Sequence, residues 1–126
     1  MYKLTTRWFA RWAKKEHISD EQLLKSIKDL GDKLSTVSLG SGLYKVRVAS
    51  CGSGKSSSYR TIVIFRKDDR VLMVYGFSKS KQDNLTTSEL KEFKAFSKEF
   101  LAFLDDELEE LVKQNKFISI GDNHER

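Results

Sequence analysis

Six basic residues in the middle of the chain have the types and spacing needed to bind a phosphate and polarise it. Lys45 and Arg47 lie two residues apart in a segment of alternating pattern, so both project from one face of a strand. Arg60 begins the next strand-like segment and Lys79 follows a third, so pairing of these segments would gather their charges on one sheet face. Such a cluster binds a phosphodiester backbone and stabilises charge that develops on its oxygens. The six basic residues are Lys45, Arg47, Lys55, Arg60, Arg66 and Lys79.

The distribution of charge agrees with this interpretation without deciding it. The net charge is +5, and residues 41–82 carry nine basic and two acidic side chains, an excess of +7. A basic segment of this kind attracts polyanions, of which nucleic acid is the commonest. A solvated strand face that alternates Lys and Arg with Val explains the pattern as well, so charge alone leaves both interpretations open.

A glycine-rich loop, Gly52-Ser53-Gly54-Lys55-Ser56, contains the end of a phosphate-binding P-loop. The full motif requires a glycine where Ala49 stands, and it requires a helix after the loop, whereas a strand-like segment follows here. An NTPase is therefore disfavoured. What is left is a cationic loop whose Lys55 and Ser56 are suited to contact a phosphate.

The remaining chemically active side chains do not form a motif. His17 and His124 lack partners at metal-binding or catalytic spacing, and Cys51 has no histidine near it in sequence. No CxxC or HExxH pattern occurs, so we expect neither a metal nor a cofactor. The phenylalanines at helical spacing between residues 93 and 103 are typical of core packing.

Length and composition indicate one globular domain over residues 1–126. Hydrophobic residues make up 39% and charged residues 33%, which is the balance of a soluble protein. No apolar run is long enough to span a membrane, and the first residues lack the apolar stretch of a secretory signal. A single cysteine forms no internal disulfide, so we expect a cytoplasmic protein.

The hydrophobic pattern predicts an α+β fold. Helices are expected over 5–16 and 19–30, the second capped by Ser19, followed by a loop over 31–42. Three strands are expected to form an antiparallel sheet, with a tight turn between the second and the third. The third strand is apolar on both faces, so both faces should be covered. These strands are expected over 43–50, 59–66 and 70–77.

The C-terminal part, residues 86–120, is expected to be mainly helical. A helix over 87–104 should be followed by a short helix for which Asp105 is the N-cap, and an apolar strand-like segment lies at 117–120. Helices that pack against an antiparallel sheet define the α+β class.

Several segments together resemble a HigB-like branch of the RelE/ParE toxin superfamily. Tyr59-Arg60-Thr61 after a GSGK loop is similar to that branch's GKSGGYR stretch, and Tyr75-Gly76-Phe77 with Lys79 and Asn84 is similar to its YGF-x-K-x-x-x-x-N stretch. The opening TRWFARWAKKEHISDEQL and the ending FLDDELEELVKQNKFISI also resemble that branch, so the resemblance covers nearly the whole chain.

The resemblance implies a toxin of a type II toxin–antitoxin pair that cleaves mRNA on the ribosome. It implies a helix-turn-helix antitoxin as partner, together with the ribosome and mRNA, and it assigns phosphate handling to Lys45, Arg47 and Arg60, with Lys79 as a further basic group. The alternative is a non-nucleolytic toxin or RNA-binding module of the same fold, such as a ParE-like gyrase poison. We expect the RNA to be bound by Lys55, Ser56, Tyr59, Arg66 and Tyr75.

Two departures from the branch affect the mechanism. Ser57 and Ser58 replace a glycine pair in the loop, and no obvious tyrosine or histidine comes after Lys79 to act as a late proton donor or acceptor, since the nearest tyrosine, Tyr75, lies within the third strand. Metal-independent RNA cleavage needs a base for the 2′-OH and stabilisation of the phosphate charge. Our hypothesis is that Lys45 is the base, because neighbouring cations favour its neutral form, and that arginines hold the phosphate oxygens.

Overall fold

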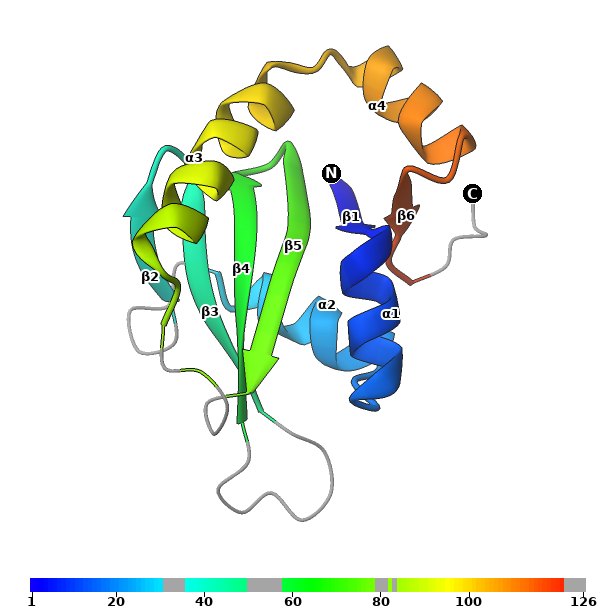
Figure 1. The fold of residues 1–126 in the computed structure, drawn as a ribbon. Coiled ribbons are helices and arrows are strands. Elements are labelled where there is room, and N and C mark those ends of the chain that lie inside the picture. The colour runs from blue at the N-terminus through cyan, green and yellow to red at the C-terminus, as the bar shows by residue number, and fades with distance from the viewer. Residues whose placement is uncertain (31–35, 50–57, 79–81, 83, 122–126) are drawn as a thin grey trace.

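The computed structural model describes residues 1–30, 36–49, 58–78, 82 and 84–121. These residues form one six-stranded sheet in the order β2-β3-β4-β5-β1-β6, with α3 crossing one face and α2 lying against the other (Figure 1). The strands are β1 (Tyr2–Thr6), β2 (Thr36–Gly40), β3 (Leu43–Ala49), β4 (Ser58–Arg66), β5 (Arg70–Ser78) and β6 (Phe117–Ser119). The helices are α1 (Arg7–Lys15), α2 (Asp20–Lys28), α3 (Thr87–Ala102) and α4 (Asp105–Lys113).

The predicted α+β class and the three antiparallel strands are confirmed, with boundaries that differ by a residue or two. In β3–β4–β5 each strand runs antiparallel to the next, and Asp68 adopts a positive φ of 60° in the tight turn before β5. The Ser19 hydroxyl accepts a hydrogen bond from Gln22 N–H at the start of α2, as the sequence predicted.

Two strands were missed, and the sheet is mixed rather than purely antiparallel. The helix predicted from residue 5 begins at Arg7, because Thr5 and Thr6 belong to β1, which runs parallel to β5. The loop predicted over 31–42 contains β2, which pairs antiparallel with β3. Both strands have five residues and no strong alternation, so only their partners identify them as strands.

The junction between the last two helices also differs from the prediction. The helix expected to reach residue 104 ends at Ala102, and the N-cap of α4 is Leu104 instead of Asp105. Leu104 N–H donates to the Glu107 carboxylate at 2.7 Å, which leaves the Asp105 carboxylate to accept from Arg70 at 3.2 Å. The segment at the C-terminal end is β6, which pairs with β1 at the edge of the sheet.

The sheet separates two hydrophobic layers. On the side of α1 and α2, Phe9, Leu23 and Met73 are buried together, and on the side of α3 and α4 Ile62 and Phe100 are buried together. Consecutive residues of β5 are buried on both sides, as the apolar character of that strand predicted. Burial of a large aliphatic or aromatic side chain contributes about 1.5–3 kcal/mol each, so these two layers hold the helices on the sheet.

A buried arginine joins the sheet to the α3–α4 junction. The Arg70 side chain is 3% exposed, and its guanidinium donates to the carbonyl oxygens of Phe100 at 3.1 Å and Phe103 at 2.6 Å. It also pairs with the carboxylates of Asp69 and Asp105. The buried charge is therefore well supplied with hydrogen-bond acceptors, which makes its burial tolerable.

We predict that Arg70→Ala lowers the free energy of unfolding by roughly 3 kcal/mol, because it leaves buried carbonyl groups without a donor. Arg66→Ala is the matched control. Arg66 also contacts Asp69 and an α3 carbonyl, yet its side chain is 49% exposed, so its removal should cost less than about 1 kcal/mol. Urea unfolding followed by circular dichroism measures both, and equal destabilisation of the two variants would contradict this account.

Candidate functional site

Strand pairing brings three of the predicted cations together on one face of the sheet. Arg47 of β3 lies directly opposite Arg60 of β4, and Lys45 lies two pairs further along, opposite Ile62. These residues share the face of Leu43 and Ile62, which pack under α3, whereas Val46 points to the opposite layer. Directly opposite residues have Cβ atoms about 5 Å apart, so the two arginine side chains start from neighbouring positions on this face.

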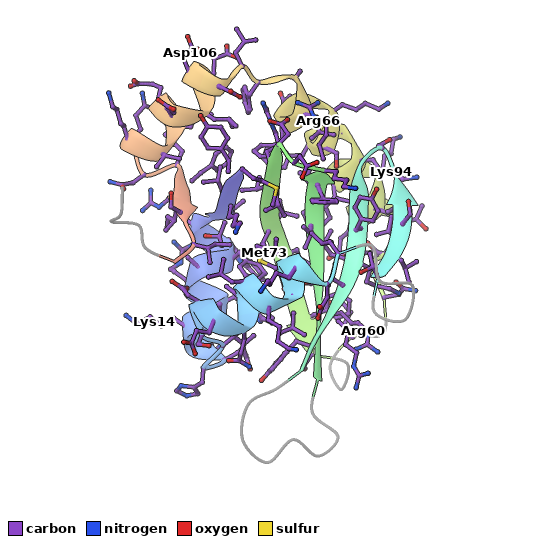
Figure 2. The ribbon with its side chains drawn as sticks, turned by 180° about the vertical axis from the view of Figure 1, so that it is seen from behind. Lys14, Arg60, Arg66, Met73, Lys94 and Asp106 are labelled. Atoms are coloured by element: carbon purple, nitrogen blue, oxygen red, sulfur yellow. The ribbon has the colours of Figure 1, made fainter. Side chains whose placement is uncertain are left out.

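The cations lie at the end of the sheet that α3 leaves uncovered. Arg60 lies at this end of the sheet, whereas Arg66 lies at the opposite end (Figure 2). Arg47 is exposed, while Lys45 and Arg60 are partly buried. Among the described residues Arg47 has no carboxylate partner. Like charges directly opposite each other on a sheet destabilise the strand pairing slightly.

The segment between β5 and α3 positions Lys45. The Lys45 ammonium donates to Asn84 Oδ1 at 3.3 Å, and the Gln82 side-chain amide donates to the Asn84 carbonyl at 2.8 Å. Thr86 and Glu89 form a capping box at the start of α3 and so hold this segment in place. Asn84 was recognised in the sequence only as a motif match, and Gln82 was not recognised at all, because side-chain contacts across this distance have no local signal.

Tyr75 lies beside the cations, on the neighbouring strand. An irregularity in the β4–β5 register between Ile62 and Val63 places Tyr75 opposite Ile62, on the α3 face. The phenol donates to Gln82 Oε1 at 3.3 Å, and the ring lies 4.9 Å from the Trp8 ring, centroid to centroid. Burial, with the nearby Glu89 carboxylate, raises the pKa of the phenol, so Tyr75 offers a neutral hydrogen-bonding group at neutral pH.

Two of the predicted RNA-binding residues are not brought to the cations: Tyr59 lies on the other face of the sheet, and Arg66 lies on the same face but at the far end of β4. Tyr59 packs against Trp12 on the α1 side, with 5.5 Å between ring centroids, and its hydroxyl donates to the Glu16 carboxylate at 3.2 Å. Burial and this carboxylate raise the pKa of the Tyr59 phenol. Arg66 lies at the opposite end of β4, where it pairs with Asp69 at 2.6 Å. Alternation along β4 already indicates that Tyr59 and Arg60 face opposite sides.

Other predicted groups lie outside the described residues. These are Lys55, Ser56 and Lys79, together with Cys51, Ser57 and His124. His17 is exposed in the turn between α1 and α2, with a positive φ of 59°, as expected of a loop histidine.

The described part of the chain offers a cationic surface and little else that is reactive. Within it no group of three or more His, Cys, Asp or Glu side chains is arranged to hold a metal ion, and no helix is long and apolar enough to cross a membrane. Two arginines and a lysine on one face suit a phosphodiester, because a guanidinium binds two phosphate oxygens at once. The arrangement thus defines a small α+β domain with a cationic sheet face.

Comparison with known families names the class. The family described as the RelE toxin of the RelE/RelB toxin–antitoxin system matches residues 1–120. The chain belongs to the RelE toxin family. Toxins of this family pair with RelB-type antitoxins.

The raised pKa values predict how stability changes in alkali. The pKa of Tyr2 is raised to about 12 by burial and by a hydrogen bond to Glu109, and those of Tyr59 and Tyr75 are also raised. The folded state therefore holds these protons above pH ~10, where the unfolded chain releases them, so stability is full below pH ~10 and falls as pH rises further.

Tyrosinate absorbance, recorded in the folded protein and in denaturant, measures this difference. We expect late titration in the folded protein, and Tyr75→Phe should reduce the alkaline decline of stability seen by urea unfolding. Titration of all four tyrosines together near pH ~10 in the folded protein would refute the prediction.

Proposed function

We propose that this chain is a ribosome-dependent mRNA endonuclease that arrests translation and needs no metal. The observation that carries the proposal is the pairing of Arg47 with Arg60, beside Lys45, on an uncovered sheet face. Cleavage of mRNA is the general activity of RelE toxins, and a cationic face of this kind suits the substrate.

The three cations have different roles in the proposed reaction. Arg47 and Arg60 bind the non-bridging oxygens of the scissile phosphate and stabilise the charge that grows there. Lys45, held by Asn84, acts in its neutral amine form and accepts the proton of the 2′-OH. The 2′-oxygen then attacks phosphorus, the bond to the 5′-oxygen breaks, and the leaving 5′-oxygen takes a proton from water. Tyr75 contacts the RNA beside them. In this proposal Lys79, Lys55 and Ser56 add contacts to the RNA backbone.

The ribosome supplies what the isolated chain lacks. The described face carries no histidine and no pair of carboxylates, so positioning of the mRNA must account for much of the rate. We therefore place the protein in the cytoplasm as one domain of residues 1–126. We assign it to the HigB-like branch, with a helix-turn-helix antitoxin whose acidic surface covers the cations, since opposite charges favour that contact.

Arg60→Ala should lower ribosome-dependent mRNA cleavage on the order of 10²-fold or more, because it removes a bidentate contact to the phosphate in the transition state. Arg66→Ala is the control: it removes an arginine from the same strand at the opposite end and should leave cleavage near that of the wild type. Primer extension on translated mRNA measures the cuts, and circular dichroism reports folding.

A folded Arg60→Ala protein that cuts mRNA normally would remove Arg60 from the mechanism. Abolished cleavage in both arginine variants would contradict the proposal that only the Arg60 end of β4 takes part in the reaction. A wild-type protein that arrests growth without cutting mRNA would favour the non-nucleolytic alternative.

Lys45→Arg tests proton transfer separately from charge. Arginine keeps the positive charge but does not give up a proton, so cleavage should fall nearly as far as in Lys45→Ala if Lys45 is the base. Cleavage close to wild type in Lys45→Arg, beside a strong decrease in Lys45→Ala, would assign Lys45 to phosphate binding instead. Single-turnover cleavage on programmed ribosomes is the appropriate measurement, because it isolates the chemical step.

A further inference from the structure

Helix α1 presents a stripe of positive charge outside the site described above. Arg7, Arg11 and Lys15 follow one another at intervals of four residues, so they share one side of the helix, and Lys14 lies next to them. All four are exposed, and α1 contains no acidic residue. Within the described residues none of the four forms an ion pair.

The stability of the helix does not explain this stripe. Arg7 occupies the first turn, where the helix dipole favours negative charge, and that turn has no acidic residue. Arg7 with Arg11, and Arg11 with Lys15, are like charges four residues apart, which each destabilise a helix by a few tenths of a kcal/mol. Lys14 and Lys15 alone are favourably placed, in the last turn. The arrangement is therefore better suited to an anionic ligand than to the free helix.

Trp8 connects the stripe to the cationic face. Trp12 lies against Gly76 of β5 so closely that a Cβ at residue 76 would overlap the indole, and this contact fixes α1 on the sheet. Trp8, one turn earlier, stacks on Trp12 with 6.2 Å between centroids and on Tyr75 at 4.9 Å. Its side chain is nevertheless 42% exposed. An exposed indole beside arginines is the usual arrangement of a surface that binds unpaired bases.

We propose that α1 is a second RNA-binding element, which receives the single strand as it leaves the Lys45–Arg47–Arg60 face. In this arrangement the RNA passes Tyr75 at the edge of β5, places an unpaired base against Trp8, and runs its phosphates along Arg7, Arg11 and Lys15. Arg60 and Lys14 mark the two ends of this path, at the end of the sheet and on the outer side of α1 (Figure 2). The inference deepens the proposed function and rests on it for the identity of the strand.

The chain contains its own reporter for this contact, since both of its tryptophans lie in α1. Tryptophan fluorescence of the full chain is titrated with a single-stranded oligoribonucleotide and with an RNA duplex of the same length. Trp12→Phe leaves Trp8 as the sole reporter and should be quenched by the single strand, whereas Trp8→Phe leaves Trp12 and should respond little. Duplex RNA should quench weakly, because its bases are already stacked.

A charge-matched pair of variants tests the stripe. Arg7→Gln with Arg11→Gln is compared with Lys113→Gln and Lys116→Gln, which remove the same charge from exposed positions on and after α4. The α1 variant should bind the single strand roughly tenfold or more weakly at low salt. The slope of log affinity against log salt should fall by about 1 for each phosphate that the variant no longer neutralises. The control should keep the wild-type slope.

The outcomes separate this inference from the proposed function. Equal affinity and slope in the two charge variants, or equal quenching by single strand and duplex, would overturn the role of α1, while Arg60-dependent cleavage would still support the endonuclease. Conversely, a protein that binds RNA through α1 but never cuts mRNA would support the α1 surface and refute the proposed endonuclease activity. Circular dichroism of each variant shows whether the variant is folded, so that weaker RNA binding caused by unfolding is not mistaken for the loss of a binding residue.

Discussion

Arg47 and Arg60 lie directly opposite each other on β3 and β4, and the packing of these two strands into the sheet holds them there. Such a like-charge pair costs up to about 1 kcal/mol, whereas each large apolar side chain buried on these strands contributes about 1.5–3 kcal/mol. Val46 and Ile62, next to the two arginines, are fully buried in opposite layers. The two hydrophobic layers thus hold two like charges side by side on the sheet, in the arrangement that the proposed phosphate contact requires.

The same packing decides where that site is open. Arg70 anchors the C-terminal end of α3 to the sheet, and the capping box of Thr86 and Glu89 defines its other end. The helix therefore covers the half of the face against which Phe100 packs and leaves the end that contains Arg60 uncovered, as Figures 1 and 2 show together. Asn84, which lies just before the capped start of α3, contacts the Lys45 ammonium. Ion pairs around the buried Arg70 at one end of the sheet thus help to hold the helix that leaves the cationic surface uncovered at the other end.

A site that is rich in charge stabilisation and poor in proton-transfer groups depends on its substrate being well positioned. For a toxin this dependence has a physical advantage, because free RNA would be bound loosely and cut slowly, whereas RNA held on a ribosome would be presented in a productive geometry. The exposed surface of α1 extends the area available for such contacts beyond the sheet. Because its charges are uncompensated within the described residues, binding there should respond strongly to salt.

The sequence by itself determined the features that depend on neighbouring residues. Alternation along residues 43–48 placed Lys45 and Arg47 on one face, Ser19 predicted the start of α2, and the short turn at Asp68 indicated that the strands on either side are antiparallel. The α+β class and the family resemblance followed from such local patterns and from motif spacing. Each of these signals arises within a few residues, where backbone geometry alone relates side-chain direction to position.

Only the tertiary structure decided the rest. The five-residue strands β1 and β2 exist because β5, β6 and β3 pair with them, and the contact of Trp8 with Tyr75 joins elements that are far apart in the chain. The Leu101 carbonyl that accepts from Arg66 lies 35 residues further along the chain, so no local pattern showed that this arginine is held against α3. The physical reason is that strand pairing and helix packing are stabilised by contacts between distant segments, whose register no local pattern contains.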